Sequence, residues 1–503
     1  MEIRFIAQSC FYIEKNNTVI ITDPWSGKNK AFYNSWVPFP YNDARYLLKN
    51  NLSDKSVYIF LSHEHSDHFD IEMLKKLYDK NKNIKFLLPN FNQYCFDKIK
   101  NIFYKNKIFF LNDNETININ KFKFKLVFEQ PLFNEHSACI IEDDKQIFIN
   151  SNDSVIDDFS IKNRNNKVII YTGQFSSVSP YPSNSLLIKK SLKEKLENAH
   201  LNLQIDNFCN GVNKTDSNIA IPSSGPAVCI PNKKKVNQMR LKIAKSKGAF
   251  DNTFIKKQMQ KKINSKFKIF FLKPNEQLKK HKNGVLTYKN KFDSKKERIK
   301  NFNNLLKFYN FKIDLNKKKK FKTRQILNKF STKFIKIYSQ LEVNKNLIFD
   351  LVISDDKKFS RFDFSTNKPN FRISSFSNLK LISKNLKKPY YSVNINFNHL
   401  EDLAERSKPF EEFWYGGHVS IIEKNKGYNA NILNVLNVMH STHLTNLLIT
   451  HSKKEECFEV NFNKKKYLVK RYCPHRGADL INCKPDEKGI ITCPAHGWKI
   501  SIF

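Results

Sequence analysis

Two short segments near the C-terminus each contain one cysteine and one histidine. Cys473 and His475 are spaced C-x-H, and after seventeen intervening residues Cys493 and His496 follow as C-x-x-H. In a [2Fe–2S] cluster with such mixed ligands, two thiolates hold one iron and two imidazoles hold the other, which raises the reduction potential. A zinc site with two cysteines and two histidines is the alternative. Zinc fingers space like ligands together, so the sequence favours the cluster over zinc.

The residues that flank these ligands resemble a known family. Residues 474–477 (Pro-His-Arg-Gly) and 496–498 (His-Gly-Trp) resemble the loops of Rieske ferredoxins and of the Rieske domains of oxygenases. The resemblance implies a Rieske-type [2Fe–2S] cluster on Cys473, His475, Cys493 and His496. Ring-hydroxylating oxygenases place a mononuclear iron after the Rieske motif, whereas only residues 499–503 follow the second loop here. The expected electron acceptor therefore lies upstream in the chain or on another protein.

A second group of potential metal ligands follows an apolar run in the N-terminal part. Residues 57–60 (Val-Tyr-Ile-Phe) predict a buried strand, and the motif H-x-H-x-D-H comes directly after it. Its ligands are His63, His65, Asp67 and His68. Four such side chains within six residues favour a metal site over a merely polar loop. Imidazole and carboxylate ligands suit zinc and iron equally, so the ligand types leave the metal open.

H-x-H-x-D-H at a strand end resembles the metallo-β-lactamase superfamily. In that family the residues that match His63 and His65 bind one metal, and those that match Asp67 and His68 face a second. The resemblance also implies that His136 matches the family's third histidine and Asp153 its bridging aspartate. Residues 22–25 (Thr-Asp-Pro-Trp) resemble the turn after the family's second strand.

One element of that family's pattern has no counterpart. The family's ligand set ends with a histidine near a proline, but residues 221–226 contain none, and we do not expect His200, the nearest candidate, to replace it. The sequence therefore predicts an incomplete second metal position. A mononuclear site with an open face is expected, which suits oxygen activation.

A metallo-β-lactamase-like domain joined to a Rieske domain resembles the nucleotide-sugar N-acetyl hydroxylases, the family of UDP-N-acetylmuramate hydroxylase and CMP-N-acetylneuraminate hydroxylase. Residues 32–36, 173–177 and 180–182 also resemble this family. The resemblance covers residues 1–230 and 455–503. With the Rieske part last, the domain order is more similar to the bacterial muramate enzymes.

This resemblance implies a complete reaction. A reductase, ferredoxin or cytochrome reduces the cluster, and electrons pass to a mononuclear iron at which O₂ converts an N-acetyl group of a nucleotide sugar to N-glycolyl. The implied iron ligands are His63, His65, His136 and Asp153. Asp67 and His68 complete or orient the ligand shell, and basic residues meet the nucleotide phosphates.

Two other classes of function stay open. In a metal-dependent hydrolase, such as a phosphodiesterase, zinc-bound water is the nucleophile and the Rieske cluster is an accessory. The missing late histidine and the electron-transfer motif disfavour this class. A nucleic-acid-associated protein would suit the formal net charge of +40, but no aromatic–basic stacking pattern supports it, so nucleic acid is not an expected partner.

The elements that must position these ligands suggest three regions. Residues 1–230 alternate apolar runs with helical stretches, which predicts an α/β fold. The family resemblance makes this an αββα metallo-β-lactamase-like sandwich. Residues 231–440 are lysine-rich, with blocks at 233–235 and 317–320 and a predicted helix over 299–311; this middle region is mixed and mainly helical. Residues 441–503 predict a small all-β Rieske domain, with a hairpin between 458–460 and 467–469.

Composition limits the location and the partners. The 40% hydrophobic and 13% aromatic content predicts a folded protein, and no apolar run is long enough to cross a bilayer. The first residues lack the order of a signal peptide and predict a strand, so a cytoplasmic location is expected. The nine cysteines are scattered, unlike a disulfide framework. Lysine is abundant throughout, so the positive charge is interpreted as compositional rather than as one binding groove.

Overall fold

The computed structural model describes the 503-residue chain except residues 27, 29, 43, 91–98, 105–106, 130–135, 157–166, 177–179, 226–227, 230–251, 264–266, 281–285, 288–295, 297–299, 302–321, 342–345, 365–369, 379–385, 406–408, 426–428, 453–455, 464, 474–479, 482 and 494–498. By internal packing the chain divides into two units. Unit 1 comprises residues 1–130, 135–178 and 197–311, and unit 2 comprises residues 131–134, 179–196 and 312–503. No described helix is both long and apolar enough to span a bilayer.

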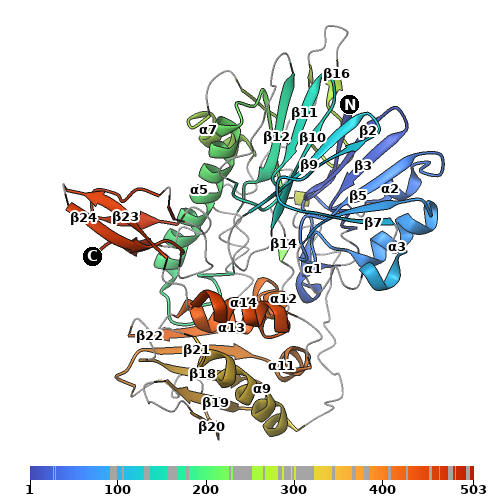
Figure 1. Cartoon of the computed structure of the whole chain (residues 1–503). Coiled ribbons are helices and arrows are strands. Elements are labelled where there is room, and N and C mark those ends of the chain that lie inside the picture. The colour runs from blue at the N-terminus through green and yellow to red at the C-terminus, as the bar shows by residue number, and fades with distance from the viewer. Residues whose placement is uncertain are drawn as a thin grey trace. The chain divides into compact units, whose positions relative to one another are not determined.

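Unit 1 contains two β-sheets that face one another (Figure 1). The first sheet has the described strand order β1-β2-β3-β5-β6-β7, and the second has the order β15-β13-β12-β11-β10-β9-β8. The strands of the first sheet are β1 (Glu2–Ala7), β2 (Cys10–Lys15), β3 (Thr18–Thr22), β5 (Ser56–Phe60), β6 (Lys85–Pro89) and β7 (Ile108–Leu111). Those of the second are β8 (Thr116–Ile119), β9 (Phe122–Phe128), β10 (Ser137–Glu142), β11 (Gln146–Asn150), β12 (Val168–Gln174), β13 (Ile219–Ser223) and β15 (Lys268–Ile269).

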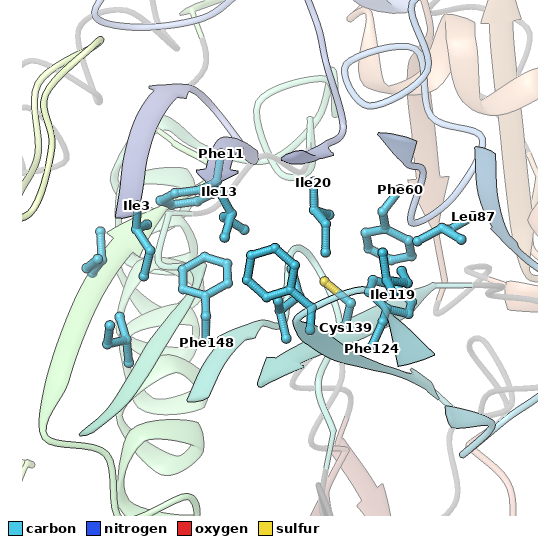
Figure 2. Close-up of a cluster of buried hydrophobic side chains, with 14 of the residues drawn as sticks. Ile3, Phe11, Ile13, Ile20, Phe60, Leu87, Ile119, Phe124, Cys139 and Phe148 are labelled. Atoms are coloured by element: carbon cyan, nitrogen blue, oxygen red, sulfur yellow. The ribbon is translucent and has the colours of Figure 1, made fainter. Parts of the chain in front are cut away.

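The space between the two sheets is filled by apolar side chains (Figure 2). Phe60 of β5 packs on Phe124 of β9 with ring centroids 5.5 Å apart, and Phe11 of β2 packs on Phe148 of β11 at 5.2 Å. Because side chains alternate between the faces of a strand, Tyr12 points to the opposite face and joins a separate cluster. Alternate apolar side chains of the first sheet therefore pack on opposite faces, and both faces are buried.

Helices cover the outer faces of both sheets. On the first sheet these are α2 (Arg45–Lys49) and α3 (Ile71–Lys80), and on the second they are α5 (Lys190–Lys214) and α7 (Asn252–Gln260). The α3 helix begins where the Asp70 side chain accepts a hydrogen bond from Met73 N at 3.0 Å, which caps its first turn. The order helix, sheet, sheet, helix confirms the predicted αββα sandwich.

Unit 2 contains a five-stranded sheet, in the described residues, of order β20-β19-β18-β21-β22. Its strands are β18 (Ile348–Ile353), β19 (Lys358–Asp363), β20 (Asn370–Ser375), β21 (Tyr390–Ile395) and β22 (Ser420–Lys424). The helices are α9 (Thr323–Tyr338), α11 (Phe397–Ala404), α12 (Phe410–Tyr415), α13 (Ala430–Val438) and α14 (Thr442–Ser452). The mixed character predicted for this region is confirmed. Both lysine blocks, and residues 302–311 of the predicted helix, lie outside the described residues.

A buried ion pair connects three strands of this sheet. Arg361 of β19 donates from Nε and Nη2 to the two carboxylate oxygens of Asp350 on β18, at 2.9 and 2.8 Å. Tyr390 of β21 donates its hydroxyl to the same carboxylate at 2.9 Å. Burial raises the pKa of Asp350, while the bonds from Arg361 and Tyr390 oppose that rise.

Asp350→Ala is expected to destabilise unit 2 by roughly 3–5 kcal/mol, because it leaves the Arg361 charge without its partner. Asp363→Asn is the matched control on β19: this carboxylate is 36% exposed and lies 3.8 Å from Lys388, so its loss should cost less than about 1 kcal/mol. Denaturant unfolding followed by circular dichroism measures both changes. Equal stabilities for the two variants would contradict the assignment of Asp350 as a structural anchor.

The C-terminal module, residues 457–503, is a small all-β structure with its own core, whereas the first residues of the predicted 441–503 domain form helix α14 (Thr442–Ser452). It contains β23 (Cys457–Phe462), β24 (Lys465–Lys470), β25 (Ile490–Thr492) and β26 (Lys499–Ser501). Phe458 lies opposite Val469, and Val460 lies opposite Tyr467, so the predicted hairpin is confirmed. Alternating residues of the hairpin pack into one buried cluster with Leu480.

Candidate metal centre

Two parallel strands bring the first part of the site together. β3 and β5 are hydrogen-bonded neighbours, so their carboxyl ends lie at the same edge of the sheet. Asp23 directly follows β3 and donates its backbone N–H to Phe60 O at 2.9 Å. The Asp23 carboxylate accepts from Ser62 N at 2.8 Å and from Ser62 Oγ at 2.7 Å. These bonds fix the start of the loop that carries the H-x-H-x-D-H motif.

The second sheet contributes the remaining candidate ligands. His136 directly precedes β10, and Asp153 follows β11 after a turn. Ser137 donates its hydroxyl to Ser62 O at 2.7 Å and so joins β10 to the motif loop of the first sheet. The site therefore lies where the ends of strands from both sheets meet, although its ligands are widely separated in sequence.

Three histidines form the first ligand group. His63, His65 and His136 each offer a ring nitrogen, and these atoms all lie within 4.8 Å of one another. His63 Nε2 and His65 Nδ1 are 2.9 Å apart, and the rings of His63 and His136 have centroids 4.3 Å apart. Convergent imidazole nitrogens at such distances are suited to a transition-metal ion.

A second ligand group shares His63 with the first. His63, His68 and Asp153 also place ligand atoms within 4.8 Å of one another. His68 Nε2 lies 3.5 Å from Asp153 Oδ2 and 3.7 Å from Asp67 Oδ2. Three buried atoms here, His68 Nε2, Asp67 Oδ1 and Asp153 Oδ1, have no hydrogen-bond partner among the described residues. Because buried polar atoms are normally satisfied, these residues fit a bound cation.

The carboxylates around the second group stabilise a positive charge there. Burial opposes a charge on His68, but the carboxylates of Asp67, Asp153 and Asp23 outweigh it and raise the pKa of His68 well above its ordinary value. Burial raises the pKa of Asp67 to about 6, partly offset by His68. For His63, burial and then the neighbouring histidines lower the pKa, which keeps its ring neutral as a ligand requires.

Hydrogen bonds to the outer ring nitrogens orient the histidines. Ser62 Oγ lies 2.9 Å from His63 Nδ1, and Asp23 Oδ2 lies 2.9 Å from His68 Nδ1. Metal-binding histidines commonly donate their second ring N–H to such partners, which fixes the tautomer. Asp23 therefore orients His68 so that its Nε2 faces Asp67 and Asp153.

A strained turn supports the motif loop from outside. Phe32, Tyr33 and Asn34, in the short helical segment α1 (Ala31–Asn34), have φ of 49°, 55° and 63°. Left-handed non-glycine residues are unfavourable and persist only where surrounding contacts hold them. Phe32 N donates to Ser66 Oγ at 2.6 Å, and the Phe32 ring lies 5.7 Å from the His65 ring. The turn thus fixes the loop at His65 and Ser66.

The structure brings together all six metal-site residues that the sequence singled out. These are His63, His65, Asp67, His68, His136 and Asp153. In the structure Asp153 lies with His68 rather than with all three histidines. A second metal position is therefore geometrically available. The expectation of a single bound metal stays a prediction. His200 lies on α5 and belongs to neither group. The sequence analysis did not single out Glu129, whose carboxylate contacts the His136 ring. No sequence motif marks this residue.

The two cluster cysteines lie in one buried core. Cys473 follows β24 and Cys493 follows β25; they are 2% and 0% exposed and belong to the same hydrophobic cluster. Neither forms a disulfide. His475 and His496 lie outside the described residues. Two buried cysteines in one small core fit the thiolate half of the predicted cluster.

Comparison with known families decides the identity of both parts. Residues 2–157 match the beta-lactamase superfamily domain, and residues 441–502 match the Rieske [2Fe-2S] domain. The chain carries a metallo-β-lactamase-fold domain and a Rieske domain. The Rieske domain confirms the [2Fe–2S] cofactor and implies an electron-transfer partner. The His/Asp groups of the metallo-β-lactamase-fold domain confirm that it can hold a metal.

Individual relatives match parts of the chain. Over 91 residues it is 37% identical to a protein assigned as a Rieske 2Fe-2S iron-sulfur protein in Mycolicibacterium smegmatis, and 35% identical to one in Mycobacterium tuberculosis. Each alignment covers 18% of this chain and 16% of the relative. The chain thus matches less than a fifth of the length of these curated relatives.

Two solved structures that match part of the chain have different descriptions. CmlA, a diiron beta-hydroxylase from Streptomyces venezuelae, is 8% identical with a TM-score of 0.33, covering 55% of this chain and 53% of that chain. YhfI, a metallo-beta-lactamase fold protein from Bacillus subtilis, is 10% identical with a TM-score of 0.33, covering 55% of this chain and 97% of that chain.

Proposed function

We propose that the protein is a Rieske-dependent monooxygenase that hydroxylates the N-acetyl group of a nucleotide sugar to N-glycolyl. The observation that carries the proposal is the presence, in one chain, of a domain that transfers single electrons and a second domain with convergent histidine and carboxylate ligands. A hydrolase needs no electrons, whereas a monooxygenase needs two for each turnover. The sequence resemblance to the nucleotide-sugar N-acetyl hydroxylases supplies the substrate class.

In this proposal the iron is held by His63, His65 and His136, with Asp153 as the carboxylate ligand. The neutral ring of His63 is shared by both ligand groups, and Asp67 and His68 complete or orient the shell. When bound, the cluster supplies electrons and the iron supplies oxygen chemistry. Overall, one O₂, two electrons and two protons convert the methyl C–H to C–OH and release one water.

The reaction requires an electron donor and a means of holding the substrate. A reductase, ferredoxin or cytochrome is the proposed donor to the Rieske domain. The formal charge of +40 provides many lysine and arginine side chains that can pair with the nucleotide phosphates. The proposed substrates are UDP-N-acetylmuramate and CMP-N-acetylneuraminate, whose phosphates would pair with basic side chains near the site.

Incubation with UDP-N-acetylmuramate, a chemical or enzymatic reductant and ¹⁸O₂ is expected to yield an N-glycolyl product that contains one labelled oxygen atom, identified by mass spectrometry. CMP-N-acetylneuraminate is the second substrate to try. Omission of either oxygen or reductant should abolish the product, because both are consumed in the balanced reaction. Absence of an oxygenated product from every N-acetyl nucleotide sugar tested would contradict the proposal.

The alternative is a metal-dependent hydrolase with an accessory cluster. The specific observation that favours it is the second ligand group of His63, His68 and Asp153, since two adjacent metals suit hydrolysis. This reading predicts phosphodiester or acyl hydrolysis without oxygen, unaffected by Cys473→Ser. The oxygenase reading predicts that the same substitution abolishes turnover, so one variant separates the two functions.

A further inference from the structure

Glu129 and His136 form a pair just beyond the end of a strand ladder. Phe128 and Ser137 are the last partners of β9 and β10, so Glu129 and His136 are the next residues outward. Glu129 N donates to His136 O at 2.9 Å, and Glu129 Oε2 lies 3.1 Å from His136 Nδ1. The side chains are 6% and 11% exposed. His136 is therefore held at both its backbone and its ring.

This contact determines which ring nitrogen of His136 faces the metal site. A carboxylate accepts a hydrogen bond, so the proton belongs on Nδ1 and the lone pair on Nε2. Ser137 holds the adjacent backbone against Ser62 O at 2.7 Å, which keeps the His136 ring beside that of His63. Glu129 thus orients His136, which among the described residues is the ligand that the second sheet contributes to the three-histidine group.

Glu129 also brings a negative charge to the three histidines of the proposed iron site, in addition to the charge of the proposed ligand Asp153. The three-histidine group contains no carboxylate, and the outer nitrogen of His63 contacts the uncharged hydroxyl of Ser62. A carboxylate on the outer nitrogen makes an imidazole a stronger donor to a cation. We infer that Glu129 is a positioning residue that tightens metal binding by His136 and favours the higher oxidation state of a bound iron.

The inference rests on the metal site of the proposed function and not on its reaction, so it can be tested with Zn²⁺ alone. In the chelator-stripped full-length protein, Glu129→Gln is expected to bind Zn²⁺ about 10- to 100-fold more weakly than wild type, measured by competition with a fluorescent chelator. Glutamine keeps the size and the acceptor oxygen but removes the charge. Glu142→Gln is the matched control, because Glu142 lies at the other end of β10 and pairs with Lys167.

Two further measurements separate positioning from simple folding. With iron bound, the Fe(III)/Fe(II) midpoint potential of the N-terminal site should be higher in Glu129→Gln than in Glu142→Gln. Glu129→Asp keeps the charge and should recover part of the lost affinity, even if the glutamine variant is less stable. A Zn²⁺ affinity for Glu129→Gln within about twofold of Glu142→Gln would overturn the inference. Failure of the oxygenase assay alone would not contradict the inference that Glu129 positions His136.

Discussion

His63→Ala is expected to empty the N-terminal metal site completely, because among the described residues His63 alone belongs to both ligand groups. His136→Ala removes a ligand from the first group, and Asp153→Ala removes one from the second. The loss of metal should therefore be larger for His63→Ala than for either of the other variants. It should also exceed the roughly 10- to 100-fold weakening typical of an outer partner. Elemental analysis of the purified variants measures the bound metal.

His200→Ala is the control for this series, since His200 lies on α5 outside both groups. It should retain the metal content of the wild type. The optical spectrum of the Rieske cluster should be unchanged in all four variants, because the two centres belong to different domains. Metal content that survives His63→Ala but is lost in His200→Ala would show that the ligand groups are wrongly assigned.

Cys473→Ser is expected to abolish both the Rieske spectrum and turnover while leaving the N-terminal metal in place. Cys473 and Cys493 would supply both thiolates of one iron, so loss of either leaves that iron without half of its protein ligands. In reduced protein the characteristic electron spin resonance signal should disappear. His475→Ala should have the same effect through the other iron.

Cys483→Ser provides a matched control in the same domain. Cys483 packs against the same hydrophobic cluster but lies between the two cysteine–histidine segments. Its substitution should leave the spin resonance signal intact. Stoichiometric zinc in the C-terminal domain, without iron or labile sulfide, would contradict the cluster assignment and restore the zinc-site alternative.

Sequence patterns predicted the elements that carry strong local signals. The apolar runs at 57–60 and 168–171 were predicted to be strands, and in the structure they lie in β5 and β12. Strands that are buried on both faces need continuous apolar residues, which gives them a clear sequence signal. The Rieske hairpin appeared with the expected pairing, since alternation specifies register. The residues of the two candidate ligand groups were predicted by spacing for His63 to His68 and by family resemblance for His136 and Asp153.

Contacts that depend on tertiary packing were not readable from the sequence. Asp23 was singled out as part of a turn, but its bonds to Ser62 and His68 arise only because β3 and β5 are adjacent parallel strands. The left-handed turn at Phe32 contains no glycine, so the usual signal for positive φ was absent. The five-stranded order of the unit 2 sheet also depends on long-range pairing, as between β18 and β21.

Because the candidate metal site lies across two sheets, metal supply should affect the amount of the protein in a cell. A metal held by His63 from one sheet and His136 from the other binds the folded chain, since unfolding separates the ligands. Each tenfold rise of free metal above the dissociation constant then adds about 1.4 kcal/mol to the free energy of unfolding. Proteases act on unfolded molecules, so a cell starved of the metal would hold fewer copies of the protein as well as less active ones. Abundance would follow the metal supply without any change in gene expression.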